Sequence, residues 1–349
     1  MERLEVHGFR NLDETQLRPH PHVNVVTGPN GAGKTSLLEA IYFLSRVRSF
    51  RTRQSDRLIR WGADEARVIA GRGQDRLGVA RSPGHTRLRL NGADASTRSA
   101  LAARLPVQLI NTEHQRLLLD GPRVRRQFLD WGTFHLEPGY RALAQRYQHA
   151  LRQRNAALRV GDRRSEQAWT PVLIHCATAV DAARHRFIQA LRPTWADLAR
   201  QWLGLENLEL RYYRGAAAEA AWEDVLDEQL ERDRTAGFTH RGPHRADLLL
   251  SRERIPAADA LSRGQQKLLV VALLVAEVQL WARQGLAPLL LIDDLPAELD
   301  PVHLRTVLHT VTDQPTQIFL TAIDGDALPV NLPPGHWYDV REGSLSAMV

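Results

Sequence analysis

The sequence predicts an α/β protein in which a helical arm interrupts a single α/β domain, and three observations support this fold class. A strand-like segment at 23–26 runs into a glycine-rich loop and then into a helical pattern at 35–44. A continuous apolar segment at 288–292 ends in two carboxylates, which is typical of a buried parallel strand. Alanine, arginine, leucine and glutamate dominate from about residue 121 to 234 at helical spacing. The predicted boundaries are 1–120 and 239–349 for the two halves of the α/β domain and 121–238 for the arm.

The remaining elements are expected from local patterns along the chain. Alternation at Leu4, Val6 and Phe9 indicates a first strand. Further strands are predicted in both halves, and they are 86–90 entering a turn at Asn91-Gly92, 107–110, 246–250, 289–292 and 317–320. Within the arm, helices are predicted at 140–158 and 171–191, and we expect 121–234 to be helical as a block.

Composition fits a soluble globular protein with a phosphate-bearing partner. Of 349 residues, 43% are hydrophobic and 25% charged, and the net charge is +6, which weakly favours nucleic acid. The single Cys176 excludes an internal disulfide. The polar start of the chain predicts no secretory leader, and the longest apolar run, Leu268–Ala276, is shorter than the roughly 20 residues of a membrane span. We expect a cytoplasmic protein without a membrane partner.

The glycine-rich loop has the phosphate-loop pattern Gly-x4-Gly-Lys-Thr. Its residues, with the next one along, are Gly28, Pro29, Asn30, Gly31, Ala32, Gly33, Lys34, Thr35 and Ser36. Backbone N–H groups in such a loop cradle phosphate oxygens, and the following helix adds its positive N-terminal end. Lys34 is expected to bridge the β- and γ-phosphates of ATP, and the Thr35 hydroxyl to bind Mg²⁺.

The paired acids after the apolar strand are expected to face the same nucleotide. Asp293 is predicted to hold Mg²⁺, through water, and Asp294 to orient or deprotonate the attacking water. Either acid alone could be a helix cap or a turn residue. Lys34, Asp293 and Asp294 therefore form the predicted catalytic set.

A third motif indicates an ATP-binding-cassette arrangement. It comprises Ser262, Arg263, Gly264, Gln265 and Gln266, about 30 residues before the paired acids and directly before an apolar helix. Free N–H groups at that helix N-terminus suit anionic phosphate. In the cassette class this motif closes over the nucleotide of a second subunit, so we expect a head-to-tail homodimer holding two ATP molecules. Glu298, Leu299 and Asp300 would then meet their twins across the interface, or would be a plain helix N-terminus before Pro301.

Taken together, the motifs resemble the RecF family, which is related to the heads of SMC and Rad50 proteins. The matching pieces are Phe9-Arg10-Asn11, the phosphate loop, Arg125-Arg126-x-Phe128-Leu129-Asp130, Gln153-Arg154-Asn155, Thr239-x-x-Gly242-Pro243-His244-Arg245, the serine-glycine motif, and Asp293-Asp294 with Glu298-Leu299-Asp300. The resemblance covers nearly the whole chain. It implies an ABC-type P-loop ATPase head with an inserted helical arm, and it adds Arg10 and Asn11 to the expected ATP-binding residues.

The same resemblance implies a function in DNA replication and repair. It implies an ATP-dependent dimer that binds gapped DNA or single-strand/double-strand junctions without sequence preference, and that works with RecR and RecO to help load RecA. The resemblance implies a weak, DNA-stimulated ATPase. Slow turnover is also expected because Asp294 is one methylene shorter than the glutamate usual at that position. Two alternatives stay open, a passive DNA clamp with vestigial ATP sites and a transporter-type ATPase subunit.

Three positions depart from the family pattern. Thr112-Glu113-His114-Gln115 replaces a proline-glutamate-aspartate-leucine run near the γ-phosphate sensor, Ala246-Asp247 follows Gly-Pro-His-Arg, and Thr321-Ala322 stands where transporter cassettes carry a histidine. These departures affect the fine catalytic detail and not the class.

Arginine supplies almost all of the positive charge, because lysine occurs only at Lys34 and Lys267. The candidate DNA contacts lie in three arginine clusters, and they are Arg51, Arg53, Arg123, Arg125, Arg126, Arg152 and Arg154. Ordinary solvated surface is the competing explanation for each cluster, and the first could instead reach the nucleotide. Lys267 could touch the nucleotide, the dimer seam or solvent. His244 and Arg245 could contact a nucleotide or an interface, or form a buried structural pair.

Overall fold

The computed structural model describes residues 1–326, 328 and 332–348, and the chain divides into two compact units. Unit 1 comprises Met1–His114 and Trp281–Val349, and unit 2 comprises Gln115–Leu280. The predicted boundary at 238/239 differs from this division. Residues 239–280 group with the arm because the strand at Asp247–Arg252 pairs with a strand inside the arm segment, at Leu208–Tyr213.

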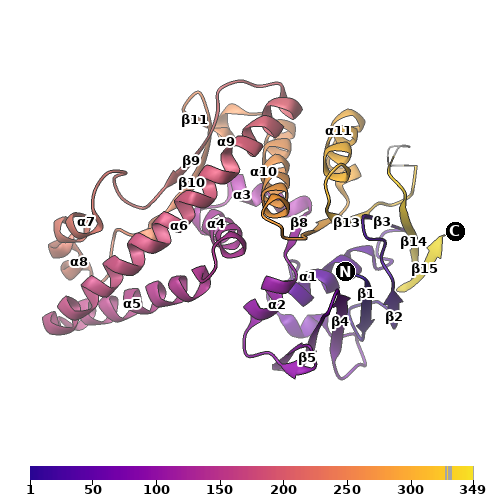
Figure 1. Ribbon diagram of the computed structural model, residues 1–349, viewed down its shortest axis with the longest axis horizontal. Helices are drawn as coiled ribbons and strands as arrows, with labels where there is room; N and C mark the ends of the chain where they lie inside the picture. Colours follow the sequence, from indigo (N-terminus) through magenta and orange to yellow (C-terminus); the bar gives the residue numbers. More distant parts are fainter. Residues whose placement is uncertain (327, 329–331, 349) are drawn as a thin grey trace. The chain divides into compact units, whose positions relative to one another are not determined.

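Unit 1 contains a mostly parallel sheet whose strands appear in Figure 1 beside helix α1 (Lys34–Arg46). The strand order is β15-β14-β3-β13-β12-β8. The bounds are β3 (Val23–Thr27), β8 (Val107–Ile110), β12 (Leu289–Ile292), β13 (Gln317–Thr321), β14 (Gly335–Arg341) and β15 (Ser344–Met348). β3, β13, β12 and β8 run parallel, so their carboxyl ends share one edge. The predicted strands at 23–26, 107–110, 289–292 and 317–320 are confirmed.

A second, antiparallel sheet of unit 1 has the strand order β2-β1-β4-β5-β6-β7. Its strands are β1 (Arg3–His7), β2 (Thr15–Leu17), β4 (Ala66–Arg72), β5 (Asp75–Ser82), β6 (His85–Leu90) and β7 (Ala93–Asp94). Apolar residues from one face of this sheet, from α1 and from the parallel sheet form one core, with Leu4, Phe43 and Phe319 fully buried. The shorter helices of unit 1 are α2 (Arg98–Arg104) and α11 (Pro301–Thr312), with 3-10 turns at Ser55–Leu58, Thr112–Gln115 and Leu295–Ala297.

The β14–β15 hairpin was not predicted from the sequence. β14 pairs in parallel with β3 and in antiparallel with β15. Its two-residue turn, Glu342-Gly343, has positive φ at both positions, the geometry of a type I′ hairpin turn. A glutamate at the first of these positions hides the signal, because asparagine, aspartate or glycine is the usual residue there.

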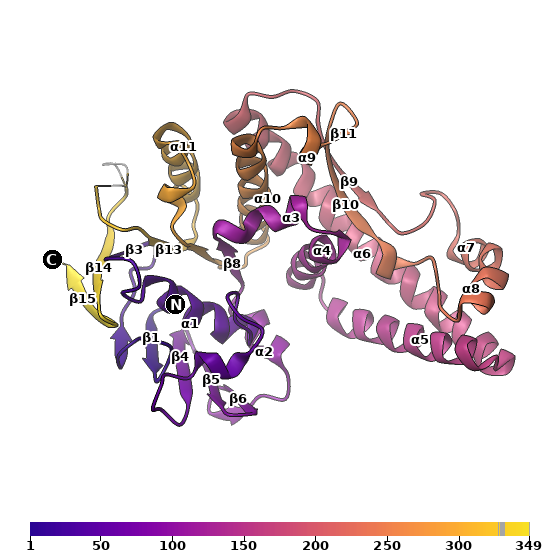
Figure 2. The ribbon, with the colours of Figure 1, turned by 180° about the vertical axis from the view of Figure 1, so that it is seen from behind.

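Unit 2 is built on two long helices, α5 (Tyr140–Val160) and α6 (Arg163–Leu203), which pack side by side (Figure 2). Gly161, in the left-handed conformation, ends α5, and the Asp162 side chain accepts a hydrogen bond from the Ser165 N–H to start α6. Their facing apolar residues form a core around Tyr147, Cys176 and Val180. The predicted helix 171–191 extends on both sides, because buried residues such as Trp195 continue the apolar face past Pro193.

The other helices of unit 2 are short apart from α4 (Pro122–Leu136) and α10 (Arg263–Arg283). The short ones are α3 (Arg116–Leu119), α7 (Trp222–Glu228), α8 (Leu230–Ala236) and α9 (Ala257–Ala260), with a 3-10 turn at Pro243–Arg245. The last three residues of α10 belong to unit 1, whose second segment begins at Trp281. α10 is the one helix in the described part of the chain with the length and apolarity of a membrane span, and 83% of its apolar window is buried, as in a core helix.

The expectation that 121–234 is helical throughout is wrong at β9 (Leu208–Tyr213). This strand pairs in antiparallel with β10 (Asp247–Arg252), which also pairs with β11 (Ile255–Pro256). The sequence Leu-Glu-Leu-Arg-Tyr-Tyr alternates as a strand does, but its six residues lie between two helical stretches and are too few to dominate that pattern.

Candidate functional site

The predicted phosphate loop and paired acids line one cavity of about 440 Å³ in unit 1. Its lining residues are Arg10, Asn11, Asn30, Gly31, Gly33, Lys34, Thr35, Ser36, Arg51, Asp293, Asp294 and Thr321. They meet because β3, β13 and β12 are neighbours and end at the same edge of the parallel sheet. Residues almost 300 positions apart in the sequence therefore face one another.

The loop has a backbone that only glycine adopts without strain. Gly28 has φ +143 and Gly33 has φ +128, both in the region that disfavours other residues. A Cβ on Gly28 would collide with the Val340 carbonyl oxygen of β14. α1 begins at Lys34, directly after Gly33, so its unpaired N–H groups open toward the cavity.

Lys34 is held in place by the loop itself. Its ammonium donates to the carbonyl oxygens of Gly28 at 2.6 Å and Pro29 at 3.0 Å, and the residue is buried. Burial lowers the pKa of Lys34, while Asp294 and Asp293 act in the opposite direction. Two of its three donors are thus engaged, and the third is left for an anionic ligand.

Thr35, Asp293 and Thr321 form a hydroxyl–carboxylate–hydroxyl chain. Thr35 Oγ1 donates to Asp293 Oδ1 at 3.0 Å, and Thr321 Oγ1 donates to the same oxygen at 2.9 Å. Burial raises the pKa of Asp293, and the two hydroxyl hydrogen bonds partly offset that increase. A hydroxyl and a carboxylate oxygen at this separation are ligands of the kind that Mg²⁺ prefers. Thr35 and Asp293 therefore fit the predicted metal-binding role.

Thr321 is a site residue that the sequence did not reveal. It lies at the position where a histidine was sought, and its hydroxyl also accepts a hydrogen bond from the Asp294 N–H at 2.9 Å. Thr321 ends β13, which lies between the phosphate-loop strand β3 and the acid-bearing strand β12. Knowledge of this strand order would have identified Thr321 as a site residue.

Asp294 has a left-handed backbone, with φ 55, and that conformation turns the chain out of β12. Burial raises the pKa of Asp294, the Lys34 charge lowers it, and the Glu298 charge raises it. A carboxylate with a raised pKa is a better proton acceptor than an ordinary aspartate. The arrangement fits a general base or a water-orienting group beside the phosphate loop.

Two arginines of the cavity share one buried partner. Arg10 makes a two-point ion pair with Glu39, at 2.9 and 2.8 Å, and Arg51 lies 3.5 Å from the same carboxylate. Glu39 is fully buried on α1 and also accepts a hydrogen bond from the Ser49 hydroxyl. Sequence reasoning missed Glu39 because a glutamate within a helix usually faces solvent. The network places Arg51 at the phosphate-loop cavity, which supports the alternative to DNA contact for this arginine.

Asn11 and Ser36 brace the loop from the side. Ser36 Oγ donates to Asn11 Oδ1 at 2.7 Å, and Asn11 Nδ2 donates to the Gly31 carbonyl at 2.9 Å. The predicted ATP-binding residues Arg10, Asn11 and Ser36 thus lie at the cavity. Glu113 stands outside this set, exposed in the 3-10 turn after β8.

The serine-glycine motif begins α10 in unit 2. Ser262 and Gln265 form a reciprocal cap, in which the Ser262 N–H donates to Gln265 Oε1 at 3.0 Å and the Gln265 N–H to Ser262 Oγ at 3.4 Å. Ser262, Arg263 and Gly264 are exposed. Gln266 is buried, and its amide donates to the Ala258 and Leu261 carbonyls, so its side chain ties α9 to α10 and is not presented outward.

The segment after the paired acids contains a capped helix start. The Asp300 carboxylate accepts from the N–H groups of Val302 and His303 and so caps α11. The plain helix N-terminus considered for Asp300 is therefore present. Glu298 and Leu299 precede it after the 3-10 turn Leu295–Ala297.

One predicted DNA contact, Arg154, is wrong because its side chain is fully buried, and a second, Arg125, is partly buried and paired inside unit 2. Arg154 is fully buried and donates to Asp233 at 2.8 Å and to the Thr239 hydroxyl at 2.6 Å. Arg125 makes a two-point ion pair with Asp247, at 2.7 and 3.0 Å. Both belong to motifs that bind distant segments together, which explains why they stood out in the sequence.

The remaining arginine candidates differ in availability. Arg53, Arg123 and Arg152 are exposed. Arg126 is partly buried and donates to the Ala246 carbonyl at 2.9 Å, and burial lowers its pKa. Lys267 is partly buried one turn into α10.

His244 is a structural residue of unit 2. Its Nδ1 lies 2.6 Å from the Tyr147 hydroxyl and its Nε2 lies 3.0 Å from the Thr239 carbonyl oxygen. Burial lowers the pKa of His244 to about 4. Arg245 is exposed and lies over the Phe238 ring at 5.7 Å. The two residues are thus not a buried pair, and only His244 has the structural role.

Comparisons with known proteins agree on one family. A family model described as the RecF/RecN/SMC N terminal domain matches residues 1–330. The DNA replication and repair protein RecF of Shewanella baltica is 38% identical, with 99% of both chains covered, and that of Pseudomonas fluorescens is 42% identical, with 94% of this chain and 92% of the relative covered. A solved structure of the recombination mediator RecF with ATP has a TM-score of 0.85 at 22% identity, covering 100% of this chain and 97% of that one. A solved structure of an SMC head bound to the C-winged helix domain of ScpA has a TM-score of 0.59 at 15% identity. The match covers 99% of this chain and 96% of that one.

Proposed function

This chain belongs to the RecF family of ABC/SMC-type ATPases, and we propose that it is an ATP-dependent, DNA-binding recombination mediator. One observation carries the proposal. Lys34, Thr35 and Asp293 converge at the carboxyl edge of a parallel sheet, in a chain that matches curated RecF proteins over nearly its full length. The family supplies the pathway, and the cavity supplies the chemistry.

ATP would bind with its phosphates in the loop. The N–H groups at the start of α1 and the remaining donor of Lys34 would contact the β- and γ-phosphates. Arg10 and Arg51, fixed by Glu39, would face the same charge. Thr35 and Asp293 would hold Mg²⁺, whose role when bound is to neutralise phosphate charge.

Hydrolysis would use Asp294. Its raised pKa and its position beside Lys34 suit it to orient or deprotonate a water that attacks the γ-phosphate. The aspartate side chain is short, so its reach toward that water is limited, and we expect slow turnover. Such a rate suits a timer that limits how long the protein stays on DNA.

The active form would be a head-to-tail homodimer with two ATP molecules at its seam. Ser262, Arg263 and Gly264 are exposed at the start of α10, where N–H groups are available to a nucleotide held by a second copy. Glu298, Leu299 and Asp300 would lie near the seam. In this arrangement neither copy has a complete site alone.

DNA would be bound through its phosphate backbone, at gaps or single-strand/double-strand junctions. The net charge of +6 supports a polyanionic partner. By membership of the family, RecR would be a direct partner, and RecO and RecA would act in the same pathway. The exposed Arg53, Arg123 and Arg152 remain candidate contacts.

The test is binding to a fluorescent gapped duplex at 0.1 M salt, with ATP, with ADP and without nucleotide. We expect ATP to tighten binding and Lys34→Ala to abolish that effect, because the loop would no longer hold the phosphates. Binding of equal strength in all three conditions would contradict the proposal and indicate a passive clamp. A fast hydrolysis rate that DNA does not change would contradict the timer role.

A further inference from the structure

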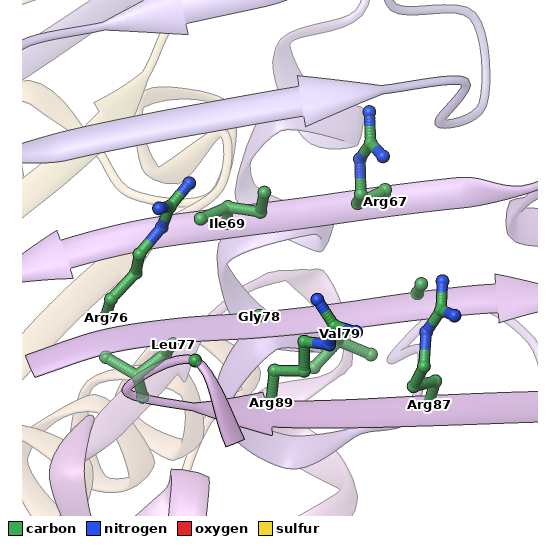
Figure 3. A pocket seen from close by; sticks show the side chains of 10 residues that line it. Arg67, Ile69, Arg76, Leu77, Gly78, Val79, Arg87 and Arg89 are labelled. Carbon is green, nitrogen blue, oxygen red and sulfur yellow. The ribbon is translucent and has the colours of Figure 1, made fainter. Parts of the chain in front are cut away.

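An arginine-lined groove lies on the solvent face of the antiparallel sheet in unit 1, away from the phosphate-loop cavity. Arg67 projects from β4, Arg76 from β5, and Arg87 and Arg89 from β6, all on one face of the sheet (Figure 3). The groove has a volume of about 220 Å³. None of these four arginines was among the predicted site residues.

The strand register explains the groove. Arg67 of β4 pairs with Ala80 of β5, which pairs with Arg87 of β6. In the next row Ile69 pairs with Gly78, which pairs with Arg89. The middle strand thus carries small side chains, while the strands on either side carry long ones. A glycine inside a strand, such as Gly78, is one of the features found where a ligand or another backbone approaches closely.

The opposite face of the same strands is the core of unit 1. Val68, Leu77 and Val79 are buried there, and Leu88 and Leu90 pack against that core. Packing of the core therefore requires Leu88 and Leu90 of β6 but not the alternating Arg87 and Arg89. The outward arginines are side chains that the fold places on this face without using them in its core.

The carboxylates near the groove do not neutralise it. Glu65 lies 3.6 Å from Arg67 and 3.7 Å from Arg87, and Asp94 lies 3.6 Å from Arg89. These are long contacts between exposed arginines and carboxylates that are exposed (Asp94) or half-buried (Glu65), and such pairs near the surface contribute little stability. Arg76 has no ion pair among the described residues. Four guanidinium groups against two carboxylates leave a net positive surface.

We infer that this groove is a binding site for the phosphate backbone of duplex DNA. The groove is open and cationic, and arginine is suited to two-point contact with phosphate oxygens. Arg87 and Arg89 are two positions apart on one strand, or roughly 7 Å, and Arg67 and Arg87 are two strand spacings apart, or roughly 10 Å. A row of phosphates can therefore contact several arginines at once. An aromatic surface for base stacking is absent from the residues lining the groove, so contact would not depend on sequence.

This inference rests on the proposed function, and salt dependence separates the two. Arg87→Gln with Arg89→Gln should weaken duplex binding about 60-fold at 0.1 M salt and reduce the slope of log K against log salt by about 2, because each phosphate contact contributes about eightfold there and about 0.9 of slope. Arg305→Gln, which alters an exposed arginine on α11, is the control and should change neither quantity.

A second pair of variants tests the groove without removing an arginine. A Cβ on Gly78 would lie 3.7 Å from the Arg89 Cβ and 3.9 Å from Ile69 Cγ1, which is ordinary contact, so a side chain fits. Gly78→Glu should weaken duplex binding at least eightfold, since its carboxylate competes with phosphate for the arginines. Gly78→Gln, of the same size and uncharged, should bind clearly more tightly than Gly78→Glu.

The outcomes distinguish the claims. If the unaltered protein binds no duplex at 0.1 M salt, the proposed function fails and this inference with it. If it binds, and the double variant keeps both affinity and slope, the inference alone is overturned. If the double variant keeps duplex binding but loses binding of an oligoglutamate peptide, the groove recognises an acidic protein segment instead of DNA.

Discussion

Replacing Thr321 by valine tests the hydroxyl–carboxylate–hydroxyl chain that lines the phosphate-loop cavity. Valine has nearly the shape of threonine, so the substitution removes two hydrogen bonds with little change in packing. The lost bonds are the donation to Asp293 Oδ1 and the acceptance from the Asp294 N–H, each 2.9 Å long. The first involves a carboxylate and stabilises by about 1.5–3 kcal/mol, and the second by about 1 kcal/mol.

We therefore expect Thr321→Val to lower the free energy of unfolding of the nucleotide-free protein by about 2–4 kcal/mol, measured by urea unfolding. The pKa of Asp293 should rise further, since the Thr321 hydrogen bond lowers it. ATP hydrolysis in a single turnover should slow by about 10- to 100-fold, because the two acids lose their positioning.

The conservative variant Thr321→Ser is the control for this prediction. Serine retains the hydroxyl and should restore most of the stability and most of the hydrolysis rate. The reasoning is refuted if Thr321→Val unfolds within about 0.5 kcal/mol of the unaltered protein and hydrolyses ATP at the same rate. A serine variant as impaired as the valine variant would also refute it, since methyl packing would then be the cause.

Three further predictions concern charges in the two units. Because burial raises the pKa of Asp293 above its unfolded value, the charged carboxylate destabilises the nucleotide-free protein at neutral pH. Thermal unfolding should therefore show that Asp293→Asn is more stable there, by a margin that shrinks as pH falls through the folded pKa of Asp293. Calorimetry should show that the same variant has lost Mg²⁺-dependent ATP binding. The pKa of His244 is lowered from 6.5 to about 4, so the stability that His244 contributes is present above pH 6.5 and is lost as pH falls toward 4. The free energy of unfolding should fall by about 3 kcal/mol over this range in the unaltered protein and not in His244→Gln. Equal pH profiles of unfolding for the two proteins would contradict the structural role of His244. Arg154→Met should destabilise unit 2 by about 3–5 kcal/mol, because the buried Asp233 would lose its arginine partner and keep only His240. The exposed Arg152→Met should cost less than about 0.5 kcal/mol, and equal unfolding midpoints for the two variants would contradict a structural role for Arg154.

The elements predicted correctly from the sequence are those with a strong local signal. The phosphate-loop strand and α1 follow from an apolar run, glycines at strained positions and a helical period. β12 and its two acids follow from a continuous apolar segment that ends in charge. In these cases the local pattern and the tertiary environment agree, so the pattern alone is sufficient.

The features that the sequence left hidden depend on which strands become neighbours. Thr321 reaches Asp293 because β13 lies between β3 and β12, and that order is a property of the sheet. Glu39 is buried because two arginines from distant loops converge on it. β9 was missed because its partner, β10, lies far along the chain and its own alternation is short.

The arginines show the limit of reasoning from clusters. Arg154 and Arg152 are two positions apart on α5, yet one is buried against Asp233 and the other is exposed. A charge run in the sequence does not distinguish these cases, because a helix turns by about 200° over two residues. Burial of the partner decides the role of each arginine, and the partner of Arg154 is 79 positions away.

The central claim is that each nucleotide site is completed by a second copy of the chain. Asp294→Asn should leave Lys34, Thr35 and Asp293 in place, and so should bind ATP but not release it by hydrolysis. Sedimentation of this variant with Mg²⁺ and ATP should show a dimer that reverts to a monomer when ATP is removed, and adding Ser262→Arg should prevent the dimer from forming. A variant that binds ATP and remains a monomer at every protein concentration tested would contradict the account.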